Sequence, residues 1–186
     1  MRSRTLWALA APLMLAAHHP TPTVVLVKQT DVIRHTLPGA TQFFLRTVTV
    51  GKDDLDRIRK EIDYTPEDPD VKFYLGKRAD GQAAGVVFFP QVNTMHGPIE
   101  VGLTMGPDGA VASVVVTKAT VETKPWVEEA VATGMLDRFR EMRYGDKVES
   151  ALAAADRLGG MSGWEAQVIT TAVHHGLVLY HDLFHE

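Results

Sequence analysis

Alternating apolar and polar positions fill the middle of the chain and predict an antiparallel β-sheet. Two strands flank Asp80-Gly81 within residues 71–92, and two more flank Pro107-Asp108-Gly109 within residues 97–119. An Asp-Gly pair between such runs is a strong signal for a β-hairpin turn. Residues 41–50 are rich in β-branched and aromatic side chains and predict another strand. An antiparallel sheet with one apolar face needs a cover.

Helical spacing of apolar residues on either side of this meander predicts the remaining elements. A short helix is expected from Thr30 to Leu37, and a second over residues 51–62 with Asp53 or Asp54 as its N-cap. Residues 126–142 and 163–184 also show apolar residues three and four apart. The last segment carries one broad apolar stripe, which consists of Ile169, Ala172, Val173, Gly176, Tyr180, Leu183 and Phe184. We therefore expect an α+β fold, an antiparallel meander sheet covered by C-terminal helices.

The bulk composition restricts the function. A chain of 186 residues with 45% apolar and 23% charged residues is expected to fold as one globular domain. A net charge of -4 gives no electrostatic reason to bind nucleic acid. The absence of cysteine excludes disulfides, iron–sulfur clusters and thiolate catalysis.

The N-terminus predicts export. Arg2 and Arg4 precede an apolar run from Leu6 to Ala17 that is too short to cross a bilayer comfortably. A basic start, a short apolar run and small residues at its end are typical of a secretory signal. We expect residues 1–22 to be a signal peptide or N-terminal anchor and spacer, and residues 23–186 to form a single periplasmic or extracytoplasmic domain.

Three motifs, taken in order, carry a family resemblance. They are GPIEVGLTMGPDG at residues 97–109, the pair Glu122-Thr123, and Ser162-Gly163 before the last helix. Over residues 28–180 the chain resembles the FMN-binding domain of the extracytoplasmic flavin subunits of Rnf-type and sodium-translocating NADH:quinone reductases, and of single-domain exported relatives. The resemblance implies an FMN-binding-domain-like fold and electron transfer through FMN with a membrane or extracytoplasmic redox partner. It implies an electron-transfer component more than a stand-alone enzyme.

The family's attachment motif is altered in this chain. Relatives usually bond the FMN phosphate to the threonine of a Ser-Gly-Ala-Thr motif. If Ser162-Gly163 anchors the comparison, Glu165 takes the place of that threonine; if Ala172-Val173 anchors it, the place falls on Gln167. Neither side chain can form the phosphoester, so the resemblance implies a non-covalent flavin.

The resemblance also implies where the flavin would bind. In the family, the loop that matches residues 122–124 lies against the flavin, and a helix N-terminus suits a phosphate. The expected cofactor-binding residues are Glu122, Thr123, Lys124, Ser162, Gly163, Trp164, Gln167 and Thr170. Glu165 in the first turn would repel a phosphate dianion. A flavin-free binding or assembly module that keeps the fold is therefore the alternative.

The tryptophan and histidine candidates also have structural interpretations that need no ligand. Trp126 and Trp164 could stack on a flavin ring, but aromatic residues at helix starts usually pack in the core. His96 lies in a turn, where a surface position is the common one. His174, His181 and His185 share a helical stripe that suits a solvated face, so no metal site is assigned. Motifs of hydrolytic enzymes are absent from the sequence, and no catalytic residue is assigned.

Overall fold

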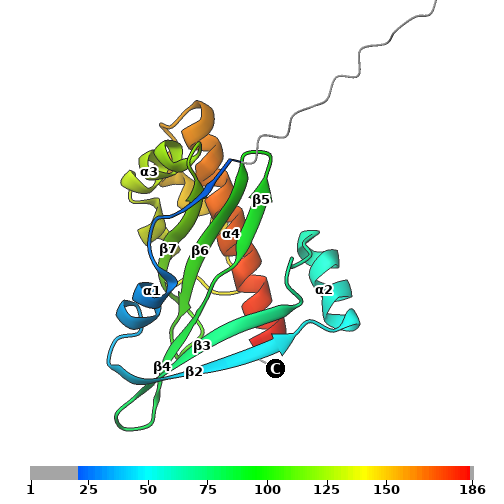
Figure 1. The fold of residues 1–186 in the computed structure, drawn as a ribbon, viewed down its shortest axis with the longest axis vertical. Coiled ribbons are helices and arrows are strands. Elements are labelled where there is room, and N and C mark those ends of the chain that lie inside the picture. Colours follow the sequence, from blue (N-terminus) through cyan, green and yellow to red (C-terminus); the bar gives the residue numbers. More distant parts are fainter. Residues whose placement is uncertain (1–20, 185–186) are drawn as a thin grey trace, which may run out of the picture.

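The computed structural model describes residues 21–184, which fold into one antiparallel sheet with helices on both faces (Figure 1). The strands run in the order β1-β7-β6-β4-β3-β2, and β5 pairs with β6 beside β4. The α+β architecture expected from the sequence is confirmed. The strands are β1 (Thr23–Val25), β2 (Ala40–Thr49), β3 (Asp70–Arg78), β4 (Ala83–Phe88), β5 (Gln91–Thr94), β6 (Gly97–Met105) and β7 (Val111–Thr120).

Both predicted hairpin turns are present. Gly81 and Gly109 have left-handed backbones with φ of 81° and 76°, which glycine adopts without a steric penalty. The strand predicted to follow Asp80-Gly81, however, is divided into β4 and β5. The division falls at Phe89-Pro90, because proline has no N–H to donate to a ladder. The N–H of Val101 instead donates to the carbonyl of Pro90 at 3.0 Å.

Four α-helices and two 3₁₀ helices lie in the described part of the chain. The sequence predicted one helix over residues 126–142, which is wrong: the first helix there ends at Ala132, and Gly134 then adopts a φ of 79°. The N-cap before residue 52 is Gly51, whose N–H donates to the Asp54 carboxylate at 3.0 Å. The helices are α1 (Gln29–His35), α2 (Lys52–Ile62), α3 (Lys124–Ala132), η1 (Met135–Phe139), η2 (Val148–Ala155) and α4 (Gly160–Phe184).

The long helix α4 lies along one face of the sheet, and α1 covers the other (Figure 1). The predicted apolar stripe of α4 is buried, with Phe184 half-buried at its end. Neighbouring residues of β6 show the two faces: Gly102 approaches Val32 of α1, whereas Leu103 approaches Gly176 of α4. No helix within residues 21–184 is long and apolar enough to cross a membrane. The predicted leader lies, up to residue 20, outside the described residues.

Substituting Gly176 by alanine will destabilise the protein by about 1–3 kcal/mol, the usual effect of overpacking a filled core. A Cβ at this position would lie 2.6 Å from Leu103 Cδ2 and 3.0 Å from the Pro90 ring, and both neighbours are buried. Urea unfolding monitored by circular dichroism measures the change. Gly159→Ala is the control, since a Cβ there meets nothing within 4 Å. Equal midpoints for the two variants would contradict the close packing of α4 on the sheet.

Candidate functional site

Three segments that are distant in the sequence meet at one end of the sheet, and we call this place the junction. They are the β5–β6 turn (residues 94–97), the β7–α3 turn (residues 120–124) and the first turns of α4. The ring of His96 joins them. Its centroid lies 6.1 Å from that of Trp126 and 5.5 Å from that of Trp164, both edge to face. The fold therefore brings together the two groups of residues that the sequence singled out.

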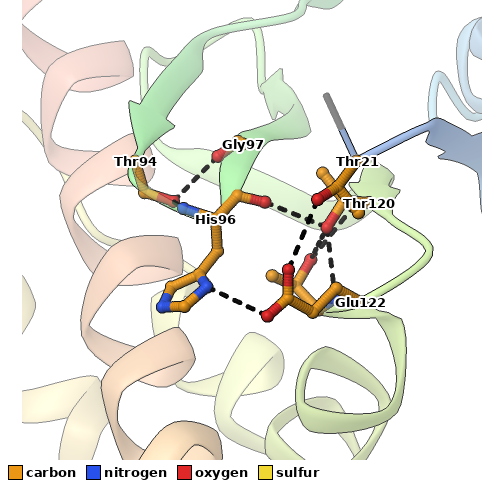
Figure 2. Close-up of polar contacts among 7 residues, drawn as sticks. Thr21, Thr94, His96, Gly97, Thr120 and Glu122 are labelled. Carbon is orange, nitrogen blue, oxygen red and sulfur yellow. Dashed lines mark hydrogen bonds and ion pairs between the residues drawn. The ribbon is translucent and has the colours of Figure 1, made fainter. Parts of the chain in front are cut away.

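The backbone of His96 is fixed by threonine side chains (Figure 2). Thr94 Oγ1 accepts a hydrogen bond from the His96 N–H at 3.1 Å and donates to the Gly97 carbonyl at 2.8 Å. Thr120 Oγ1 donates to the His96 carbonyl at 3.0 Å. Because side chains of β5 and β7 both contribute, the backbone that carries the imidazole is fixed beside the start of α4.

Thr123 holds the adjacent β7–α3 turn closed. Its hydroxyl accepts a hydrogen bond from the Thr120 N–H at 3.1 Å, and its own N–H donates to Thr120 Oγ1 at the same distance. The two hydroxyls lie 3.0 Å apart. Thr123 stands at the N-cap position of α3, but its side chain does not cap the helix. Its buried hydroxyl is thus used within the turn.

The carboxylate of Glu122 forms the solvent side of the junction (Figure 2). One of its oxygens lies 3.3 Å from His96 Nδ1, and the other accepts a hydrogen bond from Thr21 Oγ1 at 3.4 Å. Thr21 is the first described residue, so the point at which the chain enters the domain lies beside the junction. His96 therefore has an exposed carboxylate on one side and the two indole rings on the others.

Glu165 is the unusual residue of the junction. Its side chain is fully buried, and neither carboxylate oxygen has a hydrogen-bond partner among the described residues. This burial raises the pKa of Glu165 to about 7, and the nearby His96 opposes the rise. A buried polar group without a partner is uncommon in folded proteins and requires an explanation. Near neutral pH, this carboxyl group can be either a hydrogen-bond donor or an anion.

The other residues expected to bind the cofactor lie nearby, but their polar groups are largely committed to other contacts. The hydroxyl of Ser162 donates to Glu129 of α3, and that of Thr170 donates to the Ala166 carbonyl at 2.8 Å. Lys124 is exposed and lies 3.7 Å from Glu128. Helix α4 begins at Gly160, so Ser162-Gly163 lies inside its first turn and not in a turn before it.

The two candidates for the place of the attachment threonine point in different directions. Glu165 faces the protein interior, whereas Gln167 is exposed. Gly163 packs closely, since a Cβ there would lie 2.9 Å from the Leu158 carbonyl oxygen. The burial of Glu165 had a signal in the sequence: it precedes Ile169 and Ala172 of the apolar stripe by four and seven residues. Helical spacing was therefore a signal that could have placed it on the inward face, although we did not make that prediction.

The histidines predicted to share a stripe of the last helix do not form a cluster. His181 is exposed and stacks on Tyr144, with ring centroids 3.8 Å apart, and His185 lies outside the described residues. Within residues 21–184, no three histidine or acidic side chains are grouped so that they could hold a metal ion. His175, to which no sequence pattern pointed, packs on Tyr64, and its Nδ1 is buried.

The junction thus combines two indole rings, a fixed imidazole, an exposed carboxylate and a buried carboxyl group that has no hydrogen-bond partner within residues 21–184. Comparison of the chain with models of protein families, with characterised proteins and with solved structures finds no match.

Proposed function

We propose that this protein binds FMN at the junction without a covalent bond and serves as an exported electron-transfer protein. The sequence resemblance supports FMN as the ligand, and the convergence of residues 122–124 with the start of α4 supports the place. Export is supported by the pattern of residues 1–17. The membrane or extracytoplasmic partner of the family remains the proposed redox partner.

The observation that carries the proposal is the buried Glu165 carboxyl group, whose two oxygens have no partner in the described structure. A ligand that accepts a hydrogen bond from the protonated acid would satisfy one of these oxygens. The phosphate of FMN is such an acceptor, and a helix N-terminus adds unpaired N–H groups and a positive dipole end. Protonation of Glu165 removes the repulsion that its ionised carboxylate would exert on the phosphate.

The other side chains of the junction fit a flat aromatic ligand. Trp126 and Trp164 offer apolar, polarisable surface, and Lys124 adds an exposed positive charge at the start of α3. FMN, when bound, supplies the one- and two-electron redox chemistry. The chain's own part is to position the ligand, to exclude water through the two indoles, and to hold a proton on Glu165.

The proposal predicts FMN binding that weakens as the pH rises through the pKa of Glu165. Titration of the purified protein with FMN, followed by quenching of flavin fluorescence, should give a Kd that rises about tenfold between pH 6.5 and pH 8.5. The reason is that the ionised carboxylate can no longer donate and repels the phosphate. Glu165→Gln keeps a donor without a charge, so its Kd should change little over this range.

Two controls separate the possible causes. Riboflavin lacks the phosphate, so its affinity should not depend on the ionisation of Glu165. Glu149→Gln removes an exposed carboxylate outside the junction and should behave as the wild type. Acid precipitation after loading should release the flavin into the supernatant. Flavin that stays in the pellet would overturn non-covalent binding.

A flavin-free binding or assembly module is the second candidate. One observation favours it: the hydroxyls of Thr123, Ser162 and Thr170 all have partners within the protein. A wild-type protein that binds neither FMN nor riboflavin at any pH tested would favour this module and overturn the electron-transfer proposal.

A further inference from the structure

A second concave site lies where the sheet divides. Strand β4 pairs with β3 from Lys77 back to Tyr74 and then turns away. In the described structure, residues 70–73 of β3 therefore have no strand partner on that side. Among the strands of the described residues, β5 pairs with β6 alone. The β2–β3 pair and the β5–β6 pair diverge from this point (Figure 1). The opening between β3 and β5, which we call the slot, is a cavity of about 670 Å³.

The slot is separate from the junction. One of its lining residues is His175 on α4, which follows Glu165 by ten residues. Ten residues of α-helix span about 15 Å. Neither indole ring of the junction lines the slot, and neither do His96 and Glu122. The slot is therefore not the site proposed for FMN.

Aromatic side chains form the walls of the slot. Tyr74 and Phe89 meet edge to face with centroids 5.9 Å apart, and Tyr64 packs on the ring of His175 at 4.4 Å. The Tyr64 hydroxyl donates to the Gln91 carbonyl at 3.1 Å, which ties the α2–β3 loop to β5. The volume lies in the range of small-molecule sites, and such walls suit a flat apolar body.

The charges that line the slot are mainly negative. The exposed rim of the slot is acidic and consists of Glu67, Asp68 and Asp70. One positive charge lies beside them, that of Lys72, whose ammonium group is 3.7 Å from the Asp68 carboxylate. The Glu67 carboxylate also accepts hydrogen bonds from the side-chain amides of Gln91 and Asn93, so it is fixed at the edge of the opening.

Elsewhere in the lining of the slot, positive charge is neutralised or absent. Lys118 is paired with the buried Glu100 at 2.6 Å. His175 has a buried Nδ1 without a hydrogen-bond partner in the described residues. Burial, aided by the charge of His174, lowers the pKa of His175 to about 4, so its ring is neutral at physiological pH. The slot therefore has a net negative lining, to which the neutral ring of His175 adds no positive charge.

We infer that the slot binds a small organic cation with a flat apolar body, of the aryl amine or aryl amidine class. The cationic group lies against Glu67 and Asp70, and the ring packs between the aromatic walls. The neutral ring of His175, which packs on Tyr64, contributes to the aromatic wall and does not repel the cation. Charge attraction combined with cation–π contact favours such a ligand over its neutral analogue.

Benzamidine and its neutral analogue benzamide test the inference directly. Each is titrated up to about 10 mM into ¹⁵N-labelled protein, a range that detects weakly bound fragments. Benzamidine should shift the amide signals of Tyr64, Val71 and Val92 and leave the indole signals of Trp126 and Trp164 in place. Benzamide should bind at least about tenfold more weakly, because it lacks the charge.

Three variants make the result specific. Glu67→Gln keeps the shape of the rim and should weaken benzamidine binding about fivefold, an effect typical of one partly exposed charge pair. Val71→Trp places a bulky ring in the slot and should abolish binding while the remaining spectrum stays folded. Asp156→Asn removes an exposed carboxylate that does not line the slot and should have no effect.

Several outcomes would overturn the inference. Equal affinity for the two compounds means that the slot does not recognise charge. An absence of binding by the wild type up to the highest concentration means that the slot is not a site for this class. Shifts confined to the indole signals would place the cation at the junction instead.

Discussion

Replacing Glu165 by glutamine will stabilise the ligand-free protein at pH 8 and leave its stability at pH 4 almost unchanged. The pKa of this carboxyl group is about 7 in the folded state and near 4.5 when the chain is unfolded. Between these values the folded state holds a proton that the unfolded state has lost. The free energy of unfolding of the wild type therefore falls as the pH rises from 4.5 to 7 and is lowest above 7.

The expected gain for Glu165→Gln at pH 8 is about 2–3 kcal/mol, since one pKa unit corresponds to about 1.4 kcal/mol. Urea unfolding at a series of pH values measures it, because urea adds no ionic screening. Glu149→Gln, which removes an exposed carboxylate, should follow the wild-type curve. If the difference between wild type and Glu165→Gln is the same at every pH, then Glu165 is ionised in the folded state and its proposed role as a hydrogen-bond donor fails.

Lys118→Met will destabilise the protein by about 2–3 kcal/mol at pH 7. Glu100 is 5% exposed. Its carboxylate accepts hydrogen bonds from the Lys118 ammonium at 2.6 Å, the Thr117 hydroxyl at 2.7 Å and the side-chain amide of Gln29 in α1 at 2.9 Å. Removing the lysine leaves a buried negative charge with only neutral donors. Breaking a buried ion pair from one side is among the more damaging changes that a core can undergo. The partial exposure of Lys118 limits the effect.

The double variant Glu100→Gln/Lys118→Met tests that explanation. Without the Glu100 charge, the free energy of unfolding should be only about 1 kcal/mol below that of the wild type. The reason is that an amide at position 100 can still form hydrogen bonds with Thr117 and Gln29. Urea midpoints of the two single variants and the double variant form a complete cycle. A double variant no more stable than Lys118→Met would show that the lysine acts by packing of its aliphatic stem and not by its charge.

Local rules predicted the hairpins and the helical stripe well, because turn residues and periodicity act over a few positions. Asp80-Gly81 and Pro107-Asp108-Gly109 make the expected turns, and the stripe from Ile169 to Leu183 is buried. The same rules failed where a single residue ends an element. Pro90 separates β4 from β5, and the left-handed backbone of Gly134 prevents α3 from continuing. The apolar spacing runs on past both residues, so periodicity did not reveal either break.

The candidate sites depended on contacts between distant residues, which no local pattern encodes. Helical spacing could have placed Glu165 on the inward face. That its carboxylate has no hydrogen-bond partner among the described residues depends on how distant segments pack around it, which spacing does not encode. The slot arises because β3 and β5 diverge, and its histidine packs on Tyr64 from another part of the chain. The spacing of the histidines drew attention to His181, whereas the buried Nδ1 without a hydrogen-bond partner among the described residues belongs to His175.

The position of β1 bears on the order in which the protein folds. Among residues 21–184, this strand comes first and pairs with β7 alone. Beside it, Thr21 donates a hydrogen bond to Glu122, 101 residues further on. Loops of this length close slowly compared with a hairpin. In a chain that is synthesised from its N-terminus, β1 must therefore stay unpaired while the hairpins of the sheet form. The solvent side of the junction is completed only when that early strand finds its late partner.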